Sequence, residues 1–197
     1  MCRKTTEKGA FLITVSLCMI VKNEEDVLSR CLSSVQGLVE EMVVVDTGST
    51  DSTKEVARKF TDRVFDFPWA EDFSQARNFS LSQATQQFCL WMDADDVIDP
   101  EYRQGFLELK QALPPQTDVV MLPYHAAFDE GGRPVLTYYR ERLIRRLSGL
   151  SFRGAVHEAV APVGQCGSLG TARLFPIGKP APGDPDRNLR PPTYCPG

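Results

Sequence analysis

The sequence predicts an α/β fold with a Rossmann-like, mainly parallel sheet that is flanked by helices and followed by a small β-hairpin region. Short apolar runs that suit strands buried on both faces alternate with segments whose apolar residues recur at helical spacing. Strands that alternate with helices imply crossover connections, and crossovers join parallel neighbours. Clusters of polar residues directly follow three of the runs. Ligands of such sheets bind beyond the carboxyl ends of the strands, where these clusters would meet.

Four short strands are expected in the first half of the chain: residues 14–21, 42–45, 63–67 and 88–92. Apolar residues at helical spacing mark a helix that ends before Gly37. The loop over residues 47–51 offers caps to a second helix, and residues 74–84 form a third. The polar clusters at the strand ends are Lys22-Asn23-Glu24, residues 46–51 and residues 93–96.

The second half begins with a helix over residues 100–113, which Pro114-Pro115 ends. Residues 118–124 and 135–144 are expected to be strands. The turn residues 129–134 lie between them, so the two strands should form a hairpin.

The composition indicates one domain. The chain has 197 residues, of which 42% are hydrophobic and 24% charged, enough to bury one good core. We assign this domain to residues 12–175 and expect residues 176–197, rich in Pro, Gly, Asp and Arg, to be a disordered tail. The net charge of -4 and the lack of a basic block exclude an electrostatic surface for nucleic acid.

The six cysteines lack any C-x-x-C spacing, so we expect buried, reduced thiols and no zinc site. Residues 11–21 follow three basic residues and superficially match a signal peptide. The run is too short to cross a bilayer, however, and it continues into charged residues without a small-residue cleavage site. The expected location is the cytoplasm, and any attachment to the inner face of the membrane would be peripheral.

The most informative stretch covers residues 90–96, where an apolar run stops on the carboxylates of Asp93, Asp95 and Asp96. Buried carboxylates repel one another and lose hydration, so their clustering at a strand end favours a bound cation such as Mg²⁺ or Mn²⁺. For a lone Asp-x-Asp, the alternative is a solvated turn that caps the next helix.

Together the motifs resemble those of family 2 glycosyltransferases of the GT-A fold, over roughly residues 14–160. The three ordered motifs are SLCMIVKNE from Ser16, VVDTGSTD from Val44 and LWMDADD from Leu90. The chain is most similar to bacterial members that carry an Ala-Arg-Asn element, here Ala76-Arg77-Asn78, and a later Gly-x-x-His-Glu element, here residues 154–158.

The resemblance implies transfer of a sugar from a nucleotide-diphosphate donor, with a UDP-sugar favoured and with Mg²⁺ or Mn²⁺ as the cofactor. The acceptor would be a saccharide, lipid-linked or protein hydroxyl, and the reaction would be inverting and serve polysaccharide or glycoconjugate biosynthesis. Asp46 matches the carboxylate that contacts the base or ribose, and Asn23 and Glu24 are expected beside the same donor. Thr47 stands where many members have a second acid, which leaves the base preference open.

Asp93 and Asp95 match the metal motif, with Asp95 the more direct ligand and Asp93 nearer the ribose or the metal's water shell. Asp96 would instead cap the next helix. Glu158 is the candidate base that takes the proton of the acceptor hydroxyl. His157 could ligate the metal or contact the diphosphate.

Two sets of arginines leave alternatives open. Arg77 could reach a phosphate or the base from its helix, or it could be an exposed arginine paired with Glu71 or Asp72. The three arginines within residues 142–146 could meet donor phosphates or an anionic acceptor, and a solvated face is the default expectation for them.

Other function classes remain as alternatives. Sugar-nucleotide pyrophosphorylases need a glycine-rich, basic loop after the first strand, which this chain lacks. Phosphatases with an Asp-x-Asp motif carry the motif after their first strand, which this chain does not. The main alternative is a truncated, non-catalytic nucleotide-sugar-binding protein or a partner-dependent subunit, because the chain stops soon after Glu158 whereas family members commonly continue.

Overall fold

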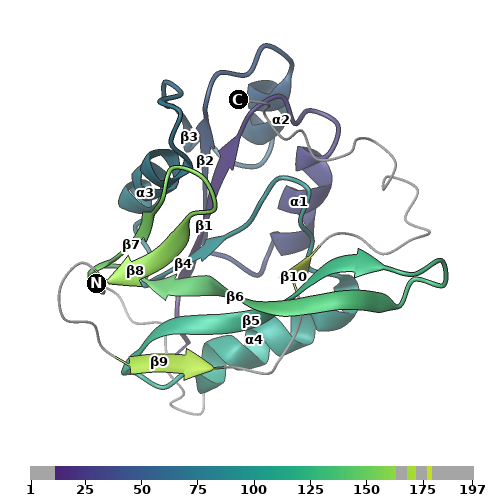
Figure 1. The fold of residues 1–197 in the computed structure, drawn as a ribbon, viewed down its shortest axis with the longest axis vertical. Helices are drawn as coiled ribbons and strands as arrows, with labels where there is room; N and C mark the ends of the chain where they lie inside the picture. Colours follow the sequence, from purple (N-terminus) through teal and green to yellow (C-terminus); the bar gives the residue numbers. More distant parts are fainter. Residues whose placement is uncertain (1–11, 163–167, 172–176, 179–197) are drawn as a thin grey trace.

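A computed structural model of the chain describes residues 12–162, 168–171 and 177–178 (Figure 1). In chain order its elements are β1 (Val15–Val21), α1 (Leu28–Val35), β2 (Glu41–Asp46), α2 (Thr53–Arg58), β3 (Val64–Asp66), α3 (Phe73–Gln83), β4 (Phe88–Trp91), the 3₁₀ helix η1 (Pro100–Tyr102), α4 (Arg103–Ala112), β5 (Thr117–Phe128), β6 (Pro134–Arg145), β7 (Leu150–Arg153), β8 (Ala159–Pro162), β9 (Ser168–Thr171) and β10 (Ile177–Gly178).

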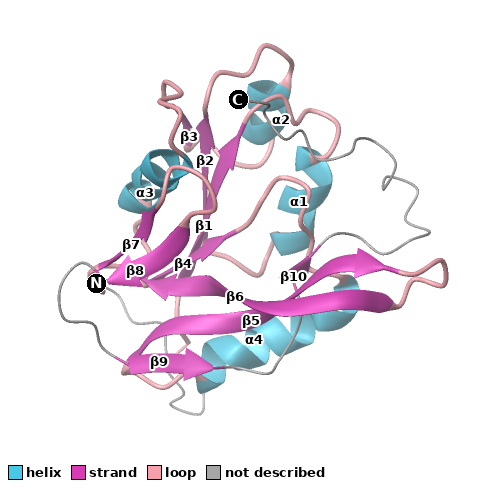
Figure 2. Cartoon of the chain, in the orientation of Figure 1, coloured by secondary structure: helices cyan, strands magenta, loops and turns pink. Residues whose placement is uncertain are grey.

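The central sheet has the strand order β10-β5-β6-β4-β1-β2-β3, and β9 pairs with β5. Strands β4, β1, β2 and β3 are parallel neighbours, as their helical crossovers require. Antiparallel β6 joins β5 to the parallel half by pairing with β4. The expected α/β architecture is therefore confirmed, with helices on both sides of the sheet (Figure 2).

The two faces of β1 are both buried, which explains its continuous apolar run. Val15, Leu17, Met19 and Val21 belong to the main core, which also contains the apolar residues of α1 and α4. Cys18 points to the other face and packs with residues of α3 and β4. A strand covered on both faces needs apolar residues at successive positions, so it loses the alternation of a half-exposed strand.

The predicted hairpin is confirmed as β5 and β6, and both strands are longer than expected, with 12 residues each. A second, two-stranded sheet of β7 and β8 packs beside α3 (Figure 1). Of the predicted tail, residues 177–178 form β10 and the others lie outside the described residues.

Three cysteines agree with the expectation of buried free thiols: Cys18, Cys31 and Cys89. The other three cysteines lie outside the described residues. Among the described residues, no helix is long and apolar enough to cross a membrane.

Candidate functional site

The carboxyl ends of β4, β1 and β2 lie side by side at one edge of the sheet. Val21 at the end of β1 is in register with Asp46 at the end of β2. On its other side β1 pairs with β4, where Cys18 is opposite Trp91, the last residue of β4 and two positions before the acidic turn of residues 93–96. Asp46 and Asp93 therefore follow strands on either side of β1, and these strands lie about 10 Å apart, at two strand spacings.

Hydrogen bonds join the loop after β1 to the loop after β2. The Asn23 side-chain oxygen accepts the Thr50 N–H at 2.8 Å, and the Asn23 N–H donates to the Ser49 hydroxyl at 2.9 Å. The Glu24 N–H donates to the Thr53 hydroxyl at 2.7 Å. Asn23 has a φ of 55°, a left-handed conformation that asparagine tolerates better than most residues. The first two predicted clusters thus form one connected rim.

Asp46 is buried, and one of its two carboxylate oxygens accepts hydrogen bonds. Its Oδ1 accepts the N–H groups of Gly48 and Ser49, both at 2.9 Å. Its Oδ2 is buried without a hydrogen-bond partner. Burial of an unpaired acceptor costs about 1–3 kcal/mol, which makes this oxygen a candidate for contact with a bound donor group.

Asp93 and Asp95 lie in the turn that follows β4. The Asp93 side chain is 39% exposed, and Asp95 is half-buried. Cys31 of α1 lies below the turn, and its thiol contacts the Asp93 carbonyl at 3.5 Å. Burial raises the pKa of this thiol, and the carboxylates of the turn raise it further. This second effect reflects the three carboxylates that gather in the turn, Asp93, Asp95 and Asp96.

Arg77 connects the acidic turn to the Gly-x-x-His-Glu element. Its Nη2 lies 2.7 Å from Asp93 Oδ1, and its Nε lies 2.6 Å from Glu158 Oε1. Burial alone would lower the pKa of the guanidinium, but Asp93 and Glu158 raise it above its ordinary value. Arg77 is buried, so the alternative of an exposed arginine paired with Glu71 or Asp72 is wrong.

The loop that carries Glu158 is attached to the start of α3, where the Phe73 N–H donates to the Ala155 carbonyl at 3.0 Å. Two residues of the loop have left-handed backbones, Gly154 with φ 104° and His157 with φ 58°. The Glu158 side chain is mostly buried, with 11% exposed, whereas His157 is exposed. The fold thus brings Glu158 to Asp93 through Arg77, and the role of His157 stays a prediction.

Two expectations for charged residues are wrong. Asp96 is fully buried and forms an ion pair with Arg142 at 3.1 Å instead of capping a helix; Asp99 occupies the N-cap position of η1. Arg142 is buried as well, because its strand β6 lies between β5 and β4. Arg145, expected on the same solvated face, pairs with Asp118 at 3.0 Å.

Sequence reasoning did not connect Asp96, Tyr124 and Arg142 with one another. Tyr124 donates its hydroxyl to Asp96 Oδ1 at 3.1 Å. The sequence signal was the position of Arg142 directly before Leu143 and Ile144, two residues of a buried strand. A charge inside such a run needs a buried partner.

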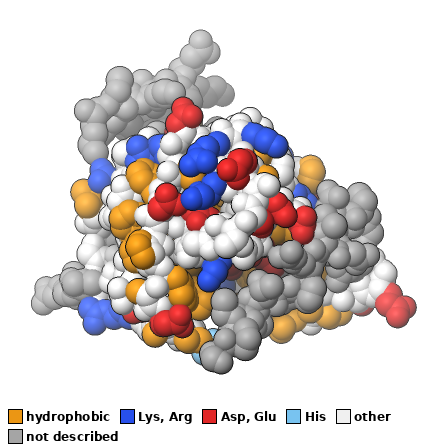
Figure 3. Space-filling view, turned by 90° about the horizontal axis from the view of Figure 1, so that it is seen from above, with side chains coloured by type: hydrophobic (Ala, Val, Ile, Leu, Met, Phe, Trp, Pro, Cys, Tyr) orange, Lys and Arg blue, Asp and Glu red, His pale blue; other side chains and the backbone are white. Residues whose placement is uncertain are grey.

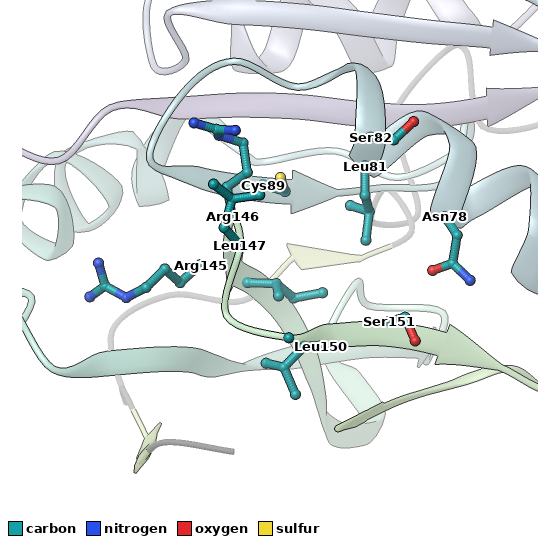
Figure 4. Close-up of a pocket in the computed structure, with 11 residues that line it drawn as sticks. Asn78, Leu81, Ser82, Cys89, Arg145, Arg146, Leu147, Leu150 and Ser151 are labelled. Atoms are coloured by element: carbon teal, nitrogen blue, oxygen red, sulfur yellow. The ribbon is translucent and has the colours of Figure 1, made fainter. Parts of the chain in front are cut away.

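Seen from above, the molecule carries acidic and basic side chains close together (Figure 3). A separate pocket of about 300 Å³ lies between α3, β4 and the turn from β6 to β7, lined among others by Asn78, Cys89 and Leu150 (Figure 4). None of the residues predicted to contact the donor nucleotide or the metal or to act as the base lines this pocket, whereas Arg145 and Arg146, two of the arginines considered above for an anionic ligand, do.

Comparison with solved structures gives the fold. S. aureus TarS (residues 1–349) superposes with a TM-score of 0.54 at 16% identity, over 81% of this chain and 60% of that one. Glucosyl-3-phosphoglycerate synthase from Mycobacterium tuberculosis, in complex with Mn²⁺ and UDP-glucose, superposes with a TM-score of 0.54 at 20% identity, over 73% of this chain and 61% of that one.

Sequence relatives include glycosyltransferases. The lipopolysaccharide core biosynthesis glycosyltransferase LpsC of Rhizobium meliloti is 31% identical over 171 residues, 83% of this chain and 63% of LpsC. A TPR repeat-containing protein of Synechococcus elongatus is 36% identical over 153 residues, 77% of this chain and 36% of the relative. The SPbeta prophage-derived glycosyltransferase SunS of Bacillus subtilis is 31% identical over 149 residues, 74% of this chain and 34% of SunS.

The chain spans only about one third to two thirds of the length of these relatives. The model of the glycosyl transferase family 2 matches residues 16–161, which is more than half of the chain. The chain therefore belongs to glycosyl transferase family 2.

Proposed function

We propose that the protein transfers a sugar from a nucleotide-diphosphate donor, with a UDP-sugar favoured, to an acceptor hydroxyl with the help of Mg²⁺ or Mn²⁺. The observation that carries this proposal is the arrangement of Asp46 and Asp93 on either side of β1. Strands β2 and β4 lie about 10 Å apart, at two strand spacings, which suits a nucleoside diphosphate with its nucleoside at Asp46 and its phosphates at the acidic turn.

Asp46 is assigned to the nucleoside. Its Oδ2 is a buried acceptor without a partner, at a strand end beside the rim that Asn23 and Glu24 help to form. A ribose hydroxyl or a base N–H would supply the missing donor and remove the desolvation cost. Thr47 is buried and donates its hydroxyl to the Val21 carbonyl at 3.1 Å, so its side chain supports the strand end.

The metal is assigned to Asp93 and Asp95. Their carboxylate oxygens are the hard donors that Mg²⁺ and Mn²⁺ prefer. Within the described ranges no three acidic, histidine or cysteine side chains gather closely enough to enclose an ion. This suits a metal that takes its remaining ligands from water and a donor diphosphate, with His157 as a further candidate ligand. When bound, the metal would stabilise the negative charge of the departing nucleotide diphosphate.

Glu158 is assigned as the base. Its mostly buried carboxylate is held by Arg77 and lies on a loop that borders the acidic turn. In an inverting transfer, Glu158 takes the proton of the acceptor hydroxyl while the new glycosidic bond forms and the bond to the diphosphate breaks. Arg77 places this base and orients Asp93 at the same time.

The relatives favour an enzyme over the alternative of a non-catalytic nucleotide-sugar-binding protein or partner-dependent subunit, because LpsC and SunS are named glycosyltransferases. We propose a role in polysaccharide or glycoconjugate biosynthesis with a saccharide, lipid-linked or protein acceptor, in the cytoplasm and with any membrane association peripheral.

Calorimetric titration tests the site. UDP is titrated into the wild type with and without Mn²⁺, and into Asp95→Ala; Asp62→Ala is the matched control, because Asp62 is exposed just before β3, at the opposite edge of the sheet. We expect Mn²⁺-dependent binding that Asp95→Ala abolishes and Asp62→Ala retains. Binding that needs no Mn²⁺, or that Asp95→Ala leaves unchanged, would remove the metal from the proposal. GDP titrated in parallel tests the preference for uridine.

A further inference from the structure

We propose that the buried residues Asp96, Tyr124 and Arg142 form a positioning network that fixes the metal-bearing turn. This inference rests on the proposed function, because it assigns a task to residues behind Asp93 and Asp95. None of the three residues is assigned to contact donor, acceptor or metal. They act through the backbone of the turn.

Asp96 closes the turn from within. Its Oδ2 accepts the N–H of Asp93 at 3.0 Å, and its own N–H donates to the Asp93 carbonyl at 3.1 Å. Its Oδ1 accepts the Tyr124 hydroxyl at 3.1 Å. Both peptide groups of Asp93 are thereby tied to Asp96, which limits the directions in which the Asp93 and Asp95 side chains can point.

Arg142 ties the turn to the sheet. Its Nη2 lies 3.1 Å from Asp96 Oδ2, and its Nη1 donates to the Trp91 carbonyl at 3.2 Å. The guanidinium also stacks on the indole of Trp91, 4.0 Å from the ring centroid, and lies 4.7 Å from that of Tyr124. The planar guanidinium of Arg142 thus holds the last residue of β4, Trp91, and the last residue of the acidic turn, Asp96.

Stability alone does not account for this arrangement. Arg142 is 1% exposed and Asp96 is 0% exposed, and removing two such charges from water has a large desolvation cost. Arg142 Nε remains buried without a hydrogen-bond partner, so the pairing is incomplete. Apolar residues of similar volume would often be as stable, but they could not hold the Asp93 amide and the Trp91 carbonyl in fixed directions.

The network also holds a positive charge, the guanidinium of Arg142, beside the carboxylates of the turn. Three carboxylates in one turn repel one another, and Arg142 offsets this repulsion from behind while Arg77 contacts Asp93 from the side of α3. Both arginines face the ring of Trp91, at 4.5 Å for Arg77 and 4.0 Å for Arg142. Outer partners of this kind typically change metal affinity by 10–100-fold when they are lost.

The test compares Arg142→Lys and Tyr124→Phe with Arg145→Lys. A lysine at position 142 keeps a cation but cannot hold both Trp91 and Asp96 with a planar fork. Tyr124→Phe removes one hydroxyl and keeps the ring, so it reports on the network even if Arg142→Lys does not fold. Arg145 is the matched control, since it lies on the same strand and pairs with Asp118 away from the acidic turn.

The readout is the Kd for Mn²⁺ in the presence of UDP, measured by calorimetry on the full 197-residue chain well below each variant's thermal midpoint. We expect the Kd to rise about 10–100-fold in Arg142→Lys, about tenfold in Tyr124→Phe and less than twofold in Arg145→Lys. Folded variants that bind Mn²⁺ like the wild type, or an equal loss in Arg145→Lys, would refute the positioning role. If the wild type binds no Mn²⁺ with UDP, the proposed function fails and this inference fails with it.

Discussion

Replacement of Arg77 by methionine should cost about 3 kcal/mol of unfolding free energy. The side chain is 8% exposed and faces two carboxylates, Asp93 at 2.7 Å and Glu158 at 2.6 Å. Breaking a buried ion pair costs about 3–5 kcal/mol, mainly because the partner charge stays buried. Glu158, 11% exposed, would bear this cost, whereas Asp93, 39% exposed, can regain water, so we expect the low end of that range.

Urea unfolding at neutral pH measures this change, and for a chain of this size the thermal midpoint should fall by about 6–12 °C. The control is Arg133→Met, because Arg133 is 84% exposed and its pair with Asp129 should be worth less than about 1 kcal/mol. The double variant Arg77→Met/Glu158→Gln should recover part of the loss, since it removes the stranded charge. If Arg77→Met lost less than about 1 kcal/mol of unfolding free energy, water would be hydrating the two carboxylates in place of the guanidinium, and Arg77 would not link them.

Two further predictions concern the sheet and the rim of the site. Burial alone would raise the pKa of Glu41, but hydrogen bonds from Ser16 and Thr85 and the charge of Arg63 hold it below its ordinary value of 4.5. A lowered folded pKa gives stability that is present above pH 4.5 and lost as the pH falls through the folded pKa. The loss of unfolding free energy caused by Glu41→Gln should therefore shrink on acidification. An equal loss in urea unfolding at pH 7 and pH 3 would contradict this. Gly48 has a φ of +111° with no atom within 4 Å of an added Cβ, so Gly48→Ala should cost about 1–3 kcal/mol through backbone strain alone. Equal thermal midpoints for Gly48→Ala and Gly131→Ala, a glycine without positive φ in the β5–β6 turn, would speak against strain at Gly48.

The sequence predicted those features that local patterns determine. Three of the four parallel strands were recognisable because β1, β2 and β4 are largely buried on both faces and therefore carry continuous apolar runs. Their polar ends could be placed together because parallel strands end at one edge. Asp46 and the acidic turn were located in this way.

Partners distant in sequence could not be predicted. Arg77 meets Glu158 across 81 positions, and this contact depends on how the loop after β7 folds onto α3. Arg142 is buried only because β6 lies between β5 and β4, a strand order that no local pattern specifies. A short acidic turn before a helix favours a capping role for Asp96, whereas its buried partner, Arg142, lies 46 residues later in the chain.

The most direct test of the proposed transfer is the Mn²⁺-dependent release of UDP from UDP-glucose, with water or an added saccharide as the acceptor, by the wild type and by Glu158→Gln. We predict that the wild type releases UDP only with Mn²⁺, and that Glu158→Gln binds Mn²⁺ and UDP normally but loses most of the release. The loss should be about 10²–10⁴-fold, the usual contribution of a general base. Equal release by the two proteins would contradict the assignment of Glu158, and no release by the wild type from UDP-glucose or other UDP-sugars would contradict the proposed transfer from a UDP-sugar.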